Sequence, residues 1–124
     1  MVAAGGRRDR SFARGLAAET AACAALEREG WSVLQRRLRT KAGEIDIVAA
    51  RQDMLAIVEV KARTSLAEAA MALGARQRAR LLAAAEIAVA EHPDWVRPDM
   101  RFDLLLVDAR GTVRRIADAF RWEN

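Results

Sequence analysis

The chain has 124 residues, of which 52% are hydrophobic and 31% are charged, a composition typical of one soluble globular domain. It contains no apolar run as long as the roughly 18 residues of a membrane helix and no secretory signal, so we expect a cytoplasmic protein without a membrane partner. Cys23 is the only cysteine, which excludes an intramolecular disulfide and a cysteine-based metal site. The 21 basic and 17 acidic residues give a net charge of +4, which favours a polyanionic partner.

The first predicted element is a helix over residues 12–29, which follows a basic tail over residues 1–11. The apolar residues at helical spacing are Phe12, Leu16, Cys23 and Leu26. Gly30 is a natural stop for this helix. Glu19 lies on the same apolar face, where a purely structural helix would carry an apolar residue, so Glu19 is a candidate functional residue.

Five strands and a second helix are predicted in the rest of the chain. The strands are expected at residues 31–38, 43–50, 55–62, 101–107 and 112–116, and the helix at residues 75–91. A turn at residues 51–53 would join the second and third strands as an antiparallel hairpin. This order predicts a single α/β domain over residues 12–124, with a mixed central sheet flanked by helices.

Charged side chains interrupt the third predicted strand, in "VEVKAR". Side chains in a strand alternate between faces, so Glu59 and Lys61 are expected to share one face while Val58 and Val60 lie on the other, in the core. The second strand, "GEIDIV", has the same pattern.

In that second strand, Glu44 and Asp46 are expected to share a face, with Ile45 and Ile47 behind them in the core. If the hairpin turns at Gln52, Asp46 lies opposite Glu59 of the third strand.

Two facing carboxylates repel each other, so the Asp46 and Glu59 pair requires a compensating positive charge. A hard divalent cation such as Mg²⁺ prefers carboxylate oxygens and keeps water in its other positions. Lys61 would then stand beside the ion, where it could orient an attacking water or stabilise charge on a phosphate. A structural ion-pair network of Asp46, Glu59 and Lys61 is the alternative interpretation.

The predicted element order and the Asp46, Glu59, Lys61 pattern resemble the PD-(D/E)XK nuclease superfamily, which has a restriction-endonuclease-like αβββαβ core. More closely, "GEIDIV", "VEVKAR" and "RFDLLLV" resemble the YraN-like family of small bacterial proteins, itself similar to archaeal Holliday junction resolvases. The resemblance covers residues 15–120. It implies that Asp46 and Glu59 are ligands of Mg²⁺ or Mn²⁺, that Lys61 is the catalytic lysine, and that Glu19 is an additional acidic catalytic residue.

The resemblance implies a metal-dependent endonuclease with branched or structured DNA as its expected substrate, and DNA is favoured over RNA although the sequence alone does not distinguish them. A homodimer would supply the two active sites that symmetric cleavage of a four-way junction needs. The residues expected to contact nucleic acid are Arg37, Arg39, Lys41, Arg63, Arg76, Gln77 and Arg80. The alternative interpretation of these basic residues is that they are solvated charges on the surface and bind no ligand.

Two positions depart from the family pattern: Arg37 stands where Asn is frequent, and Gln77 stands where Lys is frequent. These departures favour an alternative function, a non-catalytic nucleic-acid-binding or protein-interaction module that retains the fold. Glu44 also matches the family motif, and both a structural and a catalytic role are open for it. For Asp103, in "RFDLL", a structural pairing with Arg101 is favoured over a role in the site.

Overall fold

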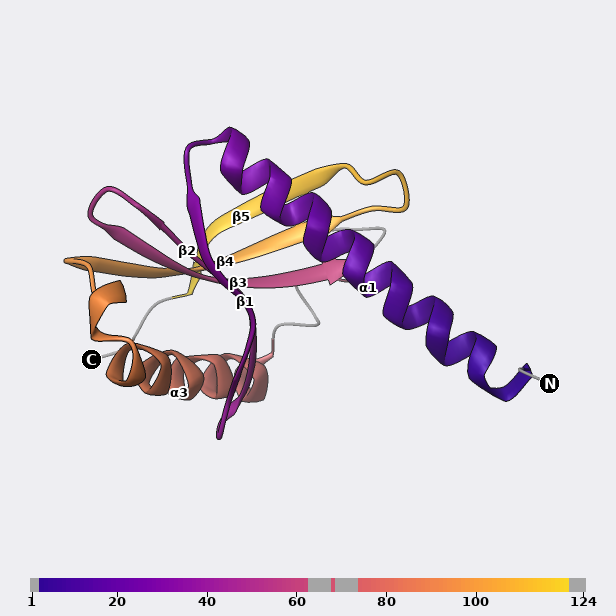
Figure 1. Ribbon diagram of the computed structural model, residues 1–124, viewed down its shortest axis with the longest axis horizontal. Coiled ribbons are helices and arrows are strands. Elements are labelled where there is room, and N and C mark those ends of the chain that lie inside the picture. The colour runs from indigo at the N-terminus through magenta and orange to yellow at the C-terminus, as the bar shows by residue number, and fades with distance from the viewer. Residues whose placement is uncertain (1–2, 63–67, 69–73, 121–124) are drawn as a thin grey trace.

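The computed structural model describes residues 3–62, 68 and 74–120, and for residues 3–14 and 120 it describes the backbone alone. The elements are α1 (Ala3–Arg28), β1 (Ser32–Thr40), β2 (Gly43–Arg51), β3 (Met54–Ala62), α3 (Ala75–Glu91), a 3₁₀ turn η1 (Pro93–Trp95), β4 (Asp99–Val107) and β5 (Val113–Phe120) (Figure 1). Every predicted helix and strand is present. The largest difference is at the start of α1, which includes residues 3–11 of the predicted basic tail.

The strands form one mixed sheet in the order β1-β2-β3-β4-β5. Strands β3 and β4 are parallel, and the other neighbours are antiparallel. The parallel pair requires a crossover connection, and α3 lies in the segment that connects β3 to β4. The mixed α/β class predicted from the sequence is therefore confirmed.

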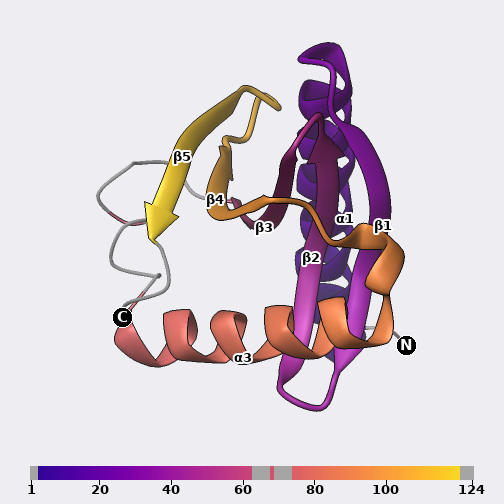
Figure 2. The ribbon, with the colours of Figure 1, turned by 90° about the vertical axis from the view of Figure 1, so that its left-hand side faces the viewer.

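Helices α1 and α3 cover opposite faces of the sheet (Figure 2). Ala56 and Val58 of β3 pack against α1, whereas Leu55 and Ile57, which alternate with them, pack in the core on the α3 side. Burial on both faces explains why β2 and β3 are nearly continuous apolar runs. Within the described residues, no helix is both long and apolar enough to cross a bilayer.

Strands β2 and β3 pair in the register predicted from the turn. Ile47 pairs with Val58, and Ala49 pairs with Ala56. The pairing described for this hairpin ends at Ile47 and Val58, one residue short of the two carboxylates. The hairpin is thus a regular, buried ladder up to the point where the candidate site begins.

The prediction that Ile45 and Ile47 share one face of the sheet is wrong. Ile47 packs in the core on the α1 side, whereas Ile45 packs in the core on the α3 side. Arg37, which precedes the partner of Ile45 on β1, has a left-handed backbone with φ 53°. The side-chain alternation of β2 is interrupted at Asp46, the residue between the two isoleucines.

A second irregularity lies between β4 and β5, where the register shifts between Phe102 and Leu104. The intervening Asp103 is buried, and its Oδ1 accepts a hydrogen bond of 2.8 Å from the backbone N–H of Asp118. The Arg101 Nε lies 3.0 Å from the same carboxylate oxygen. The predicted pairing of Asp103 with Arg101 is therefore confirmed, and it holds this part of the sheet together.

Candidate active site

Asp46 lies near the middle of β2, where the pairing between β2 and β3 ends. Its Oδ2 accepts a 2.8 Å hydrogen bond from the backbone N–H of Val60 on β3. A side-chain oxygen thus bonds a backbone group of the neighbouring strand, which holds the carboxyl group between the two strands. The position is rigid because the strand residues that follow it, beginning with Ile47, are fully buried.

Glu59 of β3 is only 5% exposed and is surrounded by donors. The Lys61 Nζ lies 3.5 Å from its Oε2, and the Arg80 Nη2 lies 3.6 Å from the same oxygen. The Gln77 side-chain amide donates a hydrogen bond to that oxygen as well. Two residues of α3 therefore fix the orientation of Glu59 from one side, and Lys61 approaches it along its own strand.

The two carboxyl groups strongly influence each other. The pKa of Asp46 is raised to about 8, first because burial disfavours its charged form, and then because of hydrogen bonding with Glu59 and the charge of that residue. The Val60 N–H lowers this pKa, but it does not outweigh the other effects. Around neutral pH the pair therefore holds a proton, which supplies part of the positive charge that the sequence pattern requires.

Glu19 of α1 is buried next to this pair. Its carboxylate accepts bonds from the Arg36 Nε at 3.1 Å and from the Arg37 Nε at 3.3 Å, both from β1. The charge of Glu19 also contributes to the raised pKa of Asp46. The helix therefore does bring an acidic residue to the hairpin, as its position on the apolar face suggests.

A pocket of about 160 Å³ lies between α1 and the hairpin. Its charged lining residues are Glu19, Arg37, Glu44 and Asp46. Glu44 is the most loosely held of the acidic groups, because its side chain is 42% exposed and its Oε2 lies 3.9 Å from the Arg39 Nε. Glu44 thus shares the pocket with Asp46, and its role stays open between structure and catalysis.

Arg80 connects the tip of the β1–β2 hairpin to α3. Its Nη1 donates a 2.9 Å hydrogen bond to the backbone carbonyl of Glu44, and its Nε donates to the Gln77 side chain at 3.2 Å. A Cβ atom at Gly43 would overlap the Arg80 guanidinium, so the glycine of "GEID" makes room for this contact. The Arg80 guanidinium is therefore held in place at the site by hydrogen bonds to other residues of the protein.

The remaining residues predicted to contact nucleic acid are on the surface. Arg39 is 91% exposed, and Lys41 and Arg76 are also exposed. Arg63 lies outside the described residues. The predicted set thus divides into three exposed cations and three side chains, those of Arg37, Gln77 and Arg80, that bond the acidic groups of the site.

The donor set of the site fits a hard divalent cation held by Asp46 and Glu59. Mg²⁺ is commonly bound through one or two carboxylates, with water and phosphate oxygens in the other positions. Among the described residues, no group of three or more acidic, histidine or cysteine side chains is arranged to hold a metal.

Fold and site together define an α/β protein in which a half-buried and a buried carboxyl group meet where the pairing of β2 with β3 ends. The chain matches the model of "Uncharacterised protein family UPF0102" over residues 18–107 and belongs to this family. The resemblance to the YraN-like family is thereby confirmed.

Relatives with the same family name occur in several bacteria. A UPF0102 protein of Granulibacter bethesdensis is 56% identical over 99% of this chain and 76% of its own length. One of Azorhizobium caulinodans is 50% identical over 95% of this chain and 90% of its own length. One of Rhodopseudomonas palustris is 43% identical over 89% of this chain and 85% of its own length.

Sequence reasoning missed three contributors to the site. Arg36 was one of many basic residues, Gly43 was seen only as the start of a strand, and the Val60 backbone N–H has no signal in a sequence. Gly43 could have been noticed, because glycine is disfavoured inside strands and often marks a close approach of another group.

Proposed function

We propose that this protein is a metal-dependent endonuclease that hydrolyses phosphodiester bonds in branched or otherwise structured DNA. The observation that carries the proposal is the contact between two carboxyl groups from adjacent strands, the half-buried Asp46 and the buried Glu59, with the Lys61 ammonium 3.5 Å from Glu59. The described elements also occur in the order of the restriction-endonuclease-like αβββαβ core, which supports the superfamily resemblance.

Each side chain has a distinct task in this proposal. A bound Mg²⁺ or Mn²⁺ would act as a Lewis acid toward the phosphate and a bound water. Asp46 is held by the Val60 N–H, and Glu59 is oriented by Gln77 and Arg80, so both carboxylates are positioned before substrate binds. Lys61, whose side chain is 22% exposed, can orient the attacking water or stabilise charge on the phosphate.

Glu19 and the exposed cations complete the proposal. The carboxylate of Glu19 is buried and fixed by two arginines at the same pocket as Asp46, where it adds negative charge next to the pair. Arg39, Lys41 and Arg76 are exposed and suited to contact the DNA backbone without reading its sequence. A homodimer would present two such sites to a four-way junction.

A second function is favoured by the surroundings of Glu59. Its Oε2 already has Lys61, Arg80 and the Gln77 amide as partners, so the carboxylate is compensated without any metal. This arrangement fits a non-catalytic module that keeps the fold and binds nucleic acid or protein. The two functions differ in metal binding, because only a metal site predicts that Mn²⁺ raises the melting temperature.

The test is a cleavage panel with labelled four-way junctions, flaps, linear duplex and single strands, each with and without Mn²⁺. The proposal predicts Mn²⁺-dependent cleavage of at least one branched substrate. Asp46→Asn keeps the shape of the side chain and removes a ligand charge, so this variant should fold, bind Mn²⁺ weakly and fail to cleave. Absence of cleavage together with an unchanged melting temperature in Mn²⁺ would favour the binding module.

A further inference from the structure

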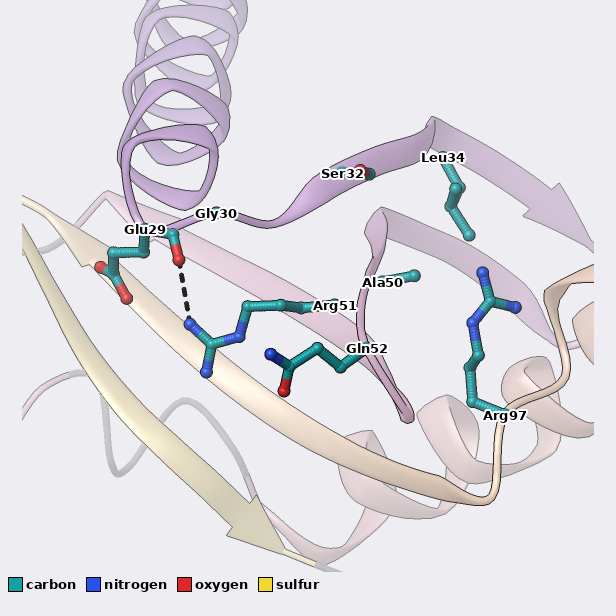
Figure 3. A pocket seen from close by; sticks show the side chains of 8 residues that line it. All are labelled: Glu29, Gly30, Ser32, Leu34, Ala50, Arg51, Gln52 and Arg97. Atoms are coloured by element: carbon teal, nitrogen blue, oxygen red, sulfur yellow. Dashed lines mark hydrogen bonds between the residues drawn. The ribbon is translucent and has the colours of Figure 1, made fainter.

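A second pocket, of about 750 Å³, lies at the end of β2 that carries Ala50 and Arg51 (Figure 3). It forms where the end of α1, the β2–β3 turn and the segment after η1 meet. The lining residues that matter for its chemistry are Glu29, Leu34, Ala50, Arg51, Gln52 and Arg97. None of these residues lines the pocket that contains Asp46.

Arg51 enters the pocket from the end of β2 with a fixed orientation. Its Nη1 donates a 3.0 Å hydrogen bond to the backbone carbonyl of Glu29. Its guanidinium carbon also lies 4.7 Å from the centre of the Trp31 ring, on which the group stacks. Its Nε and Nη2 donate no hydrogen bond to any residue that the structure describes, and they remain available to a ligand.

Arg97 lies on another side of the pocket and is held in a similar way. Its Nη1 donates to the backbone carbonyls of Trp95 at 2.9 Å, Asp94 at 3.1 Å and Val96 at 3.3 Å. Figure 3 shows its guanidinium turned toward Leu34, away from the Arg51 side chain. Among the described parts of the chain, its Nε and Nη2 have no acceptor either.

The charge of the pocket is positive. Its acidic lining residue, Glu29, forms an ion pair with Arg115 of β5, which neutralises the carboxylate. Gln52 adds an uncharged amide beside Arg51. Two guanidiniums therefore line the cavity, and no carboxylate in the described part of the chain forms an ion pair with either of them.

We propose that this pocket binds phosphate groups, carried by a nucleotide or by a nucleic-acid strand. A guanidinium presents paired N–H donors that match phosphate oxygens, and both arginines are already ordered by carbonyl contacts, so little conformational entropy is lost when a ligand binds. The volume lies within the usual range of ligand pockets. Leu34 and Ala50 offer an apolar surface to a sugar or base. Phosphate binding in this pocket does not require the nuclease activity proposed for the Asp46 site. It would serve the non-catalytic binding module equally well.

The test follows backbone amide signals of the full chain by NMR during titration with inorganic phosphate, a nucleoside diphosphate and a short single-stranded oligonucleotide. Saturable shifts centred on Gly30, Ser32 and Gln52 are expected. Arg97→Gln should weaken the affinity for each phosphate ligand about tenfold, because it removes charge-assisted hydrogen bonds while its amide can still bond the loop carbonyls. Arg114→Gln, which removes an exposed arginine from β5 outside the pocket, should leave the affinity unchanged.

Arg51→Lys provides a second variant, because lysine keeps the charge and loses the paired donors, so a smaller loss of affinity is expected. Preference for the diphosphate would identify a free nucleotide as the ligand, and preference for the oligonucleotide would identify a strand. The proposal is overturned if no ligand gives saturable shifts at these amides, if the shifts centre on residues 44–46 and 59–61, or if Arg97→Gln and Arg114→Gln bind equally well. The titration involves neither metal nor cleavage, so a negative result would not count against the proposed nuclease activity.

Discussion

The ionisation of Asp46 makes the free energy of unfolding of this protein depend on pH. The pKa of Asp46 is raised from 3.8 to about 8, so the folded state holds the proton more tightly than the unfolded state does. The stabilisation is fully present below about pH 4 and is lost as the pH rises through about 8. We expect the free energy of unfolding of the metal-free protein to fall by up to about 1.4 kcal/mol per pH unit within this window.

Urea unfolding between pH 4 and 9 in the presence of a chelator measures this slope. Asp46→Asn is the matched variant, because it cannot ionise, so the difference between the two proteins isolates the contribution of Asp46 from those of other acidic groups. Parallel pH profiles for the parent and the variant would show that the carboxyl group is not perturbed. Saturating Mn²⁺ should reduce the slope, since the cation replaces the proton.

The chemical identity of the site residues could be predicted from the sequence, whereas their partners could not. Asp46, Glu59 and Lys61 stand out because charge is rare inside apolar strands. The contacts of Gln77 and Arg80 with Glu59 depend on how α3 lies across the sheet, which no local pattern specifies. The structure therefore adds a contact with a carboxylate that no sequence pattern indicates, while a contact of these side chains with DNA stays a prediction.

At the scale of elements, the β1–β2 hairpin is joined to α3 through Arg80, and Gly43 makes the contact possible. Gly43 has a φ of 135°, which side chains rarely adopt, and an added Cβ would overlap the guanidinium. Gly43→Ala should therefore lower the free energy of unfolding by about 1 to 3 kcal/mol.

Gly15→Ala is the comparison for that prediction. Gly15 lies within α1, and no atom lies within 4 Å of an added Cβ. Alanine should stabilise the helix by about 0.5 to 1 kcal/mol, so the two substitutions are expected to have opposite signs in denaturant unfolding. If Gly43→Ala leaves the free energy of unfolding unchanged, the contact between the β1–β2 hairpin and Arg80 does not require a glycine at residue 43.

Periodicity located the elements well, because α3 and the central strands are strongly patterned. It missed residues 3–11 of α1, which carry few apolar residues and give no helical signal of their own. It also misplaced Ile45, because the side-chain alternation of β2 breaks at Asp46, and on the neighbouring strand β1 Arg37 has a left-handed backbone. Such a conformation is rare for a residue other than glycine, so a sequence pattern does not reveal it.

At the scale of the whole molecule, exposed cations should control binding to DNA. Each phosphate neutralised on duplex DNA contributes about 0.9 to the slope of log affinity against log salt. Arg39→Gln should lower this slope by about 1, whereas Arg110→Gln, in the β4–β5 turn, should not change it. Fluorescence anisotropy over a range of salt concentrations measures the slope for both variants. If the DNA affinity of the parent protein does not change with salt, a protein partner is favoured instead.

The pocket of Arg51 and Arg97 shows what sequence patterns cannot supply at this scale. Its lining residues come from the segment that follows α1, from β1, from the end of β2 with the β2–β3 turn, and from the segment after η1. No motif connects these segments, and Arg51 reads in sequence as an ordinary turn residue. Only the packing of the whole chain places the two guanidiniums around one cavity.

The most direct test of the central claim is single-turnover cleavage of a branched substrate by Lys61→Ala in saturating Mn²⁺. If the carboxylate pair holds a metal and Lys61 acts on water and phosphate, the variant should keep its melting temperature and its affinity for DNA, and cleave at least about a hundredfold more slowly than the parent. If Lys61 instead serves a structural ion-pair network, the variant should lose stability even in Mn²⁺, because the buried Glu59 loses a partner. Unchanged cleavage, or a loss of stability without any cleavage by the parent protein, would contradict the assignment.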